Sequence, residues 1–175
     1  MPDTIIRLAT KDDAEVIADL SRKTFYETFG THNTRENMEK FMSRQFTKKN
    51  LMKEVGALGN VFFLALQDEG PVGYARLRES INHKELGNVN AIEIARLYAI
   101  NKVIGTGVGK QLMNACFEKA QAMKKEIIWL GVWEKNSRAI DFYTRSGFKK
   151  FAEHPFILGN DVQNDWLLKK AVPAI

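Results

Sequence analysis

Three alternating glycines separate a strand-like segment from an amphipathic one within residues 96–110, which read Arg-Leu-Tyr-Ala-Ile-Asn-Lys-Val-Ile-Gly-Thr-Gly-Val-Gly-Lys. The pattern predicts a strand over 91–100, a tight loop, and a helix over 108–125. Glycine allows positive φ and a close approach of ligand to backbone. The first turn of a helix offers unpaired N–H groups at its positive end. Such a loop is suited to binding phosphate, although a tight turn without a ligand fits the same residues.

The spacing of this loop excludes two familiar phosphate motifs. Gln111 follows Gly109 and Lys110, where a Walker loop needs Ser or Thr. Lys110 also stands where the dinucleotide fingerprint needs a third glycine. Lys102 and Lys110 add positive charge to the loop, so an anionic ligand of another class and a turn without a ligand are the remaining interpretations.

The other segments predict a mixed α/β protein with helices on both faces of its sheet. Apolar, β-rich runs predict strands over 5–9, 61–66, 72–78, 91–100, 127–133, 148–156 and 165–169. Apolar residues at helical spacing predict helices over 11–29, from 34, from 47, over 108–125 and over 136–146. No repeat or linker divides the sequence, so we expect one domain over residues 1–175.

The composition sets the class of protein. The chain is 45% apolar and 27% charged, which fits a globular protein and excludes collagen and disordered chains. Its apolar runs are too short to cross a bilayer, and we expect no signal peptide. A lone cysteine, Cys116, forms no intrachain disulfide, so we expect a cytoplasmic protein. The formal charge of +5 suits nucleic acid, a membrane or an anionic cofactor and does not choose among them.

A second motif follows the predicted strand 127–133. Residues 136–148 read Asn-Ser-Arg-Ala-Ile-Asp-Phe-Tyr-Thr-Arg-Ser-Gly-Phe and match Asn-x-x-Ala-x-x-Phe-Tyr-x-x-x-Gly-Phe at every fixed position. With the glycine loop before it, this motif resembles the GNAT superfamily of acetyl-CoA-dependent N-acetyltransferases. The loop of that family reads Gln/Arg-x-x-Gly-x-Gly/Ala. Gly107 and Gly109 match it, but Ile104 replaces the Gln or Arg, which removes a polar side chain and leaves the backbone cradle intact.

The resemblance extends over residues 5–169 and favours one subgroup. Residues 24–29, 35–38 and 128–136 look like the bacterial PaiA-type spermidine/spermine N-acetyltransferases. The resemblance implies the GNAT fold, a mostly antiparallel sheet of about seven strands with a splayed central parallel pair, strands 91–100 and 127–133. It also implies an enzyme that transfers acetyl from acetyl-CoA to a primary amine by direct attack through a tetrahedral intermediate. The implied acceptor is a polyamine, and the family suggests a homodimer.

The resemblance assigns the cofactor contacts to both motifs. Backbone groups of Leu97, Tyr98 and Ala99 would pair with pantetheine, and an N–H near Tyr98 would stabilise the oxyanion. Loop amides would hold the pyrophosphate, and two helix side chains would reach the cofactor arm and a phosphate. The residues concerned are Ile104, Gly105, Thr106, Gly107, Val108, Gly109, Lys110, Asn136 and Arg145. A plain helix cap and a solvated charge are the alternative interpretations of the last two.

Tyr143 is the predicted general acid, and it would also contact the cofactor. The pKa of Tyr, about 10, lies above the pKa of a thiol, roughly 8.5, so the hydroxyl stays protonated and can donate to the leaving sulfur. The predicted base is Glu93, acting directly or through water, because Ala95 occupies the position where family members often have Glu. Alternation along the strand places Glu93 on the same face as Ala95. The purely structural alternatives are a half-buried helix aromatic for Tyr143 and a surface carboxylate on the strand for Glu93.

Glu27 and Glu36 are the predicted substrate-binding residues, because they lie in the helical region that forms the acceptor side in this family. Their carboxylates would attract a cationic amine; as ordinary solvated charges they would have no such role. A protein, peptide or amino-acid amine remains open as the acceptor, and so does a catalytically weak acyl-CoA-binding regulator. We expect no nucleic-acid or membrane partner and no metal, since the three histidines lack metal-ligand spacing.

Overall fold

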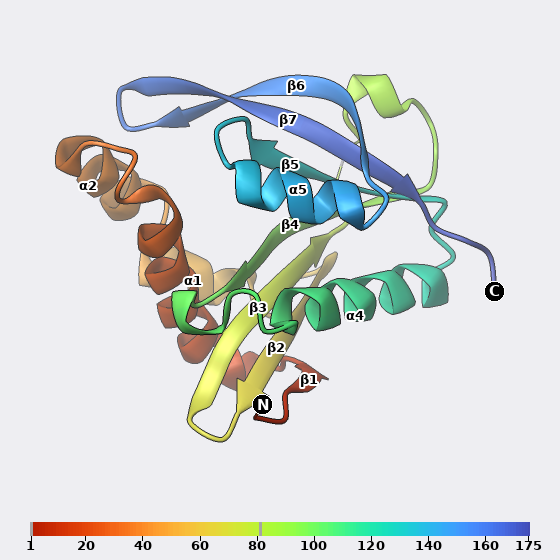
Figure 1. Cartoon of the computed structure of the whole chain (residues 1–175), viewed down its shortest axis with the longest axis horizontal. Helices are drawn as coiled ribbons and strands as arrows, with labels where there is room; N and C mark the ends of the chain where they lie inside the picture. Colours follow the sequence, from red (N-terminus) through yellow and green to blue (C-terminus); the bar gives the residue numbers. More distant parts are fainter. Residues whose placement is uncertain (1, 81) are drawn as a thin grey trace.

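Seven strands form one mixed sheet in a computed structural model that describes residues 2–80 and 82–175. Their spatial order is β1-β2-β3-β4-β5-β7-β6, and β4 with β5 is the parallel pair among antiparallel neighbours (Figure 1). The strands are β1 (Ile5–Leu8), β2 (Asn60–Gln67), β3 (Gly70–Arg78), β4 (Ala91–Ala99), β5 (Ile127–Trp133), β6 (Lys149–Leu158) and β7 (Asp161–Ala171). The predicted fold class, a mostly antiparallel sheet with a central parallel pair, is confirmed.

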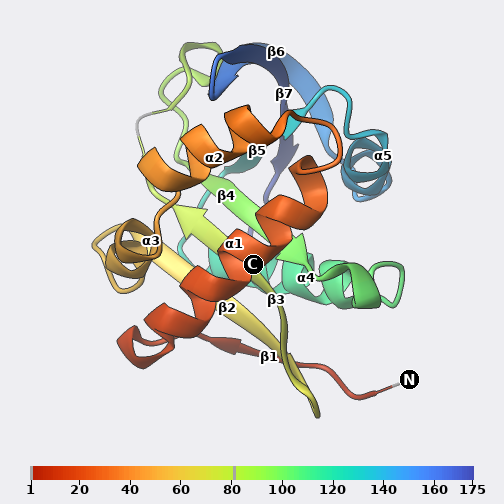
Figure 2. The ribbon, with the colours of Figure 1, turned by 90° about the vertical axis from the view of Figure 1, so that its left-hand side faces the viewer.

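Helices cover both faces of the sheet, as predicted. They are α1 (Ala14–Phe29), α2 (Arg35–Arg44), α3 (Lys48–Glu54), α4 (Val108–Ala122) and α5 (Ser137–Arg145). The buried residues of α1, α2 and α3 pack on one face, whereas α4 and α5 pack on the other. Figure 2 shows α1 and α2 crossing the near side of the strands. No helix in the described part of the chain is long and apolar enough to cross a membrane.

Local hydrogen bonds and backbone angles explain where α2 and α3 begin and where α4 ends. The Thr34 and Thr47 hydroxyls accept backbone N–H groups of Asn37 and Asn50, which fixes the starts of α2 and α3. The α4 helix ends before the expected Lys125, because Lys124 adopts a φ of 56° and the Lys125 amide turns back to the Ala120 carbonyl.

A β-bulge in β4 changes which side chains share a face. Arg76 of β3 pairs with Arg96, but Leu77 pairs with Ile94, so Ala95 has no partner on β3. An extra residue in one strand shifts the alternation of side chains by one position. Arg76 and Arg78 alternate normally on β3, so their partners Arg96 and Glu93 share a face although they are three residues apart in β4.

The two central strands separate soon after they begin. β4 and β5 pair only from Ala91 opposite Ile127 to Glu93 opposite Trp129, and then diverge (Figure 1). β5 remains paired with β7 along its whole length, so the gap lies between β4 and β5 alone. This separation positions the cavity described next.

Candidate active site

The separation of β4 and β5 opens a cavity of about 840 Å³ that reaches both faces of the sheet. Residues from α1 and α2 line it on one side, and the glycine loop, the start of α4 and the inner face of α5 line it on the other. Residues of β3, β4, β5, β6 and β7 complete the walls. The cavity is therefore built by segments that are far apart in the sequence.

The edge of β4 that faces the gap carries free backbone groups. The Ile100 amide donates to the Val72 carbonyl of β3, and Tyr98 pairs with Tyr74 in regular register. Because backbone groups alternate along a strand, those of Leu97 and Ala99 point away from β3 and into the gap. Leu97, Tyr98 and Ala99 all line the cavity, but only Leu97 and Ala99 offer their N–H and C=O groups to it.

The glycine loop presents unpaired amides where α4 begins. Gly105 has a φ of 83° and Gly107, the N-cap of α4, has a φ of 97°, both in the region that favours glycine. The first amide of the turn with an acceptor is that of Gln111, which donates to the Gly107 carbonyl. Within residues 2–80 and 82–175 no protein acceptor bonds the N–H groups of Gly105 or of residues 107–110. These amides and the positive helix end form an anion-binding cradle.

Not every predicted loop residue contributes to this cradle. The Ile104 amide donates to the Asn101 carbonyl, and the Thr106 amide and hydroxyl both donate to the Val103 carbonyl. Thr106 and Val108 are absent from the cavity wall, whereas Ile104, Gly105, Gly107, Gly109 and Lys110 line it. Ile104 and Thr106 therefore offer no free amide to an anion, whereas the unpaired Val108 amide remains part of the cradle.

The α5 helix directs its predicted residues toward the cavity. The Asn136 side chain accepts the Ala139 amide and so caps the helix, while the residue also lines the cavity. Tyr143 is 8% exposed, and burial raises the pKa of its hydroxyl, which keeps it protonated at neutral pH. Tyr143 and Arg145 both line the cavity wall.

The three predicted glutamates lie outside the cavity wall. The Glu93 carboxylate accepts two hydrogen bonds from Arg78, at 2.7 and 2.9 Å, and its side chain is 12% exposed. Glu27 accepts the backbone N–H of Asn101 at 2.9 Å, which ties α1 to the turn before the glycine loop. Glu36 is exposed and pairs with Lys40 one helical turn away.

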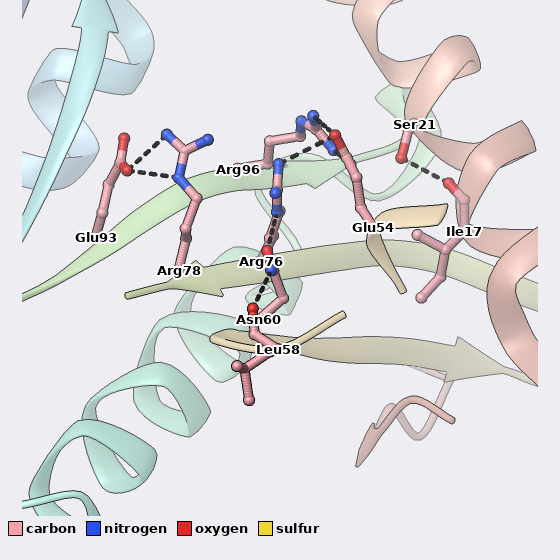
Figure 3. Close-up of polar contacts among 9 residues, drawn as sticks. All are labelled: Ile17, Ser21, Glu54, Leu58, Asn60, Arg76, Arg78, Glu93 and Arg96. Carbon is pink, nitrogen blue, oxygen red and sulfur yellow. Dashed lines mark hydrogen bonds and ion pairs between the residues drawn. The ribbon is translucent and has the colours of Figure 1, made fainter. Parts of the chain in front are cut away.

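An arginine cluster, Arg76, Arg78 and Arg96, lines the cavity on the side of α1 to α3 (Figure 3). Arg96 donates to both Glu54 oxygens, at 2.6 and 3.1 Å, and Arg76 lies 3.3 Å from the same carboxylate. The Arg76 Nε also donates to Asn60 at 2.8 Å. The sequence carries no local signal for this cluster, because strand pairing and the bulge bring its members together.

Asp165 of β7 is a carboxylate in the cavity that sequence reasoning missed. It lies opposite Trp133 of β5 and His154 of β6. Its carboxylate lies beside Gly131, where a Cβ would be 3.6 Å from Asp165 Oδ2, an ordinary contact distance. Burial raises the pKa of Asp165 to about 6; His154 opposes the increase and Glu134 adds to it. At neutral pH the group is an ionised carboxylate that readily accepts a proton.

Comparison with known proteins identifies similar sequences and folds. A family model described as the acetyltransferase (GNAT) family matches residues 15–148. The chain is similar to an uncharacterized N-acetyltransferase of Lactobacillus delbrueckii subsp. lactis, with 39% identity over 168 residues that cover 96% of each chain.

Two solved structures share the fold. One is the PaiA N-acetyltransferase from Thermoplasma acidophilum in complex with coenzyme A, with a TM-score of 0.76 and 21% identity over 97% of this chain and 99% of that chain. The other is YncA from Salmonella typhimurium with its cofactor acetyl-CoA, with a TM-score of 0.75 and 17% identity over 99% and 96% of the two chains. At these identities the likeness concerns the fold alone.

The raised pKa of Asp165 predicts how stability depends on pH. An Asp in the unfolded chain has a pKa near about 3.9, so between pH 4 and 6 the folded state retains a proton that the unfolded state has lost. Ionisation therefore destabilises the fold as pH rises through this range, and Asp165→Asn removes the effect. Relative to wild type, we expect the variant to gain on the order of 2 kcal/mol in free energy of unfolding from pH 4 to pH 7.

Urea denaturation at both pH values measures this difference. Asp68→Asn, in the exposed turn between β2 and β3, removes the same charge without changing a buried group and serves as the control. If the free energy of unfolding of Asp165→Asn changes between pH 4 and pH 7 as that of wild type does, the pKa of Asp165 is not raised in the folded state.

Proposed function

Because the chain belongs to the acetyltransferase (GNAT) family, we propose that it transfers the acetyl group of acetyl-CoA to a primary amine. One observation carries the proposal: the free edge of β4 and the unpaired amides at the start of α4 line the same cavity. A thioester with a long polar arm and a diphosphate needs both features in one place.

The residues present fit acetyl-CoA. Unpaired amides of Gly105 and residues 107–110 would hold the pyrophosphate, with Lys110 and Arg145 adding positive charge. The amide-bearing pantetheine would pair with Leu97 and Ala99, as an added strand does. The complexes of PaiA with coenzyme A and of YncA with acetyl-CoA support this choice of cosubstrate.

The reaction exchanges one bond for another. The acceptor nitrogen attacks the thioester carbonyl carbon, a C–N bond forms, and the C–S bond breaks. The Leu97 N–H faces the gap and would donate to the carbonyl oxygen as negative charge develops there. Tyr143, protonated at neutral pH, would give its proton to the departing thiolate, and a base would take the proton lost by the amine.

Two carboxylates are candidates for the base. Glu93 is the residue predicted from the sequence, but Arg78 occupies its carboxylate and it lies outside the cavity wall. Asp165 lines the cavity, and a pKa of about 6 leaves it ionised yet basic near pH 7. We assign the base to Asp165, acting directly or through a water molecule.

The polyamine acceptor rests on the resemblance to PaiA-type enzymes. The carboxylates predicted to attract it, Glu27 and Glu36, lie outside the cavity wall. Asp165 and Asp141 are the carboxylates that line the cavity. A peptide or amino-acid amine is the alternative acceptor. Thiol release from acetyl-CoA, measured with spermidine, spermine, peptides and amino acids, distinguishes these acceptors, and coenzyme A binding without turnover on any of them would favour a regulator.

Replacing Gly107 tests the phosphate cradle. A left-handed φ costs an L-residue roughly 1–2 kcal/mol, so Gly107→Ala shifts the loop and turns its amides away from a ligand. We expect coenzyme A affinity, measured by calorimetry, to fall at least about tenfold. Gly87→Ala is the matched control, because Gly87 has a φ of 66° with open space around it and lies outside the cavity wall. A folded Gly107→Ala variant with wild-type affinity would falsify the cradle.

Removing the Tyr143 hydroxyl tests the general acid. Tyr143→Phe keeps the ring, which packs edge-on against Phe142 and Phe148, and deletes the proton donor. We expect kcat to fall by about 10² to 10⁴ while coenzyme A affinity stays near wild type. Tyr26→Phe, on the exposed side of α1, is the control. If turnover is unchanged, Tyr143 is not the acid.

The pH dependence of kcat/KM separates the two candidate bases. With Asp165 as base, activity falls as pH drops through about 6, because the carboxylate becomes protonated. Asp165→Asn should remove this acidic limb and lower the plateau, while Glu93→Gln should leave the limb in place. A limb that moves in Glu93→Gln and persists in Asp165→Asn reassigns the base to Glu93.

A further inference from the structure

The arginine cluster carries more positive charge than its protein partners balance. Arg76, Arg78 and Arg96 meet two carboxylates in the described part of the chain, Glu54 and Glu93 (Figure 3). Arginine stays protonated in proteins, so the group holds one positive charge in excess. The arginines line the cavity, whereas both glutamates lie outside its wall.

The excess charge is buried, so leaving it unbalanced is costly. Arg76 is 6% exposed, and burial together with the charge of Arg96 lowers the pKa of its guanidinium to about 10. Part of the cluster still has hydrogen-bonding capacity. Arg76 makes one hydrogen bond, through Nε to Asn60, and Arg78 uses Nε and Nη2 for Glu93, within the described residues. The remaining guanidinium N–H groups suit a planar or tetrahedral anion.

The cluster lies close to the place where the acetyl group would be transferred. Arg96 is two residues before Tyr98 on the same strand face, which is roughly 7 Å along β4. Phe46 packs against Arg96, with the guanidinium 4.9 Å from its ring, and so limits the water around the charge. Asp165 lines the same cavity from β7. The acceptor region therefore combines a carboxylate from β7 with excess positive charge on β3 and β4.

We propose that the arginine cluster is an anion subsite, and that the acceptor is an amine that also carries a carboxylate or a phosphate. This inference rests on the proposed acetyl transfer and names its acceptor class. The ammonium group would lie toward Asp165 and the anion against the arginines, so one small zwitterion satisfies both. A polyamine offers only positive charge and would meet repulsion at the cluster.

A purely structural role fits the cluster less well. Arg78 with Glu93 and Arg96 with Glu54 already form two neutral pairs. Arg76 therefore neutralises no carboxylate that would otherwise be unpaired. Arg76→Met keeps an apolar stem of similar length and leaves Arg96 paired with Glu54. Loss of a buried charge is strongly destabilising when it leaves its partner unpaired. Because Glu54 keeps Arg96 in this variant, we expect Arg76→Met to fold.

The subsite is tested with pairs of acceptors that differ only in whether they carry an anionic group. Thiol release is measured with amino acids and their carboxamides, and with O-phosphoethanolamine and ethanolamine, alongside spermidine. We expect kcat/KM to be about 10- to 100-fold higher for the anionic member of at least one pair, the range of a charged hydrogen bond. The pair that responds identifies carboxylate or phosphate. Equal values within both pairs, or preference for spermidine, would overturn the subsite while leaving acetyl transfer intact.

Variants of the arginine cluster show whether the preference for an anionic acceptor arises there. Arg76→Met should raise KM for the anionic acceptor about 10-fold or more, with little change in KM for its neutral partner and unchanged coenzyme A affinity. Arg76→Lys should recover part of the loss. Arg78→Gln, at a more exposed side chain, provides the same test if Arg76→Met does not fold. Arg35→Met, on an α2 side chain that is 92% exposed, is the control. Equal loss for both members of a pair contradicts anion recognition.

Calorimetry separates failure of the subsite from failure of the proposed function. The protein with coenzyme A bound is titrated with the N-acetylated acid and with its N-acetylated amide. Tighter binding of the acid, lost in Arg76→Met, supports the subsite even if no amine is turned over. Absence of any difference between acid and amide overturns it, and absence of coenzyme A binding overturns the proposed function itself.

Discussion

The structure depends on the early separation of two parallel strands. β4 and β5 are hydrogen-bonded partners over three positions and then diverge, so the Leu97 and Ala99 backbone groups remain unpaired in the middle of the sheet. Unpaired buried backbone groups are costly unless a ligand or water satisfies them. The rest of the sheet compensates, because β3 pairs with β4 from Glu93 to Ala99, apart from the bulge at Ala95, and β7 pairs with the whole of β5. The gap is thereby kept open by ordinary antiparallel pairing on both sides.

Charge is distributed around this gap in a way that suits two different ligands. On the side of α4, backbone amides and a helix end offer partial positive charge, to which Lys110 and Arg145 add full charges. On the side of α1 and α2, the arginine cluster and Asp165 present both signs. Tyr143, protonated because it is buried, also lines the cavity. One cavity therefore presents an anion-binding cradle at the start of α4 and charges of both signs on the side of α1 and α2.

Local signals were sufficient for the order of the elements and for the glycine loop. Threonine caps, apolar periodicity and glycines are properties of neighbouring residues, so Thr34, Thr47 and Gly107 could be interpreted without the fold. The charged groups of the cavity could not, because Arg76, Arg96 and Asp165 meet through pairing between strands. Glu93 illustrates the difficulty: simple alternation placed it beside Ala95, and the bulge pairs it with Arg78.

The unpaired Ala95 is an extra residue in β4, and this limits what its loss could change. Ile94 already pairs with Leu77 and Arg96 with Arg76, which are neighbours on β3, so a strand without Ala95 would keep Ile92 and Ile94 on the core face. Ala95 also lines the cavity, next to Arg96. Insertion or deletion at this position would therefore spare the core and reshape the wall of the cavity.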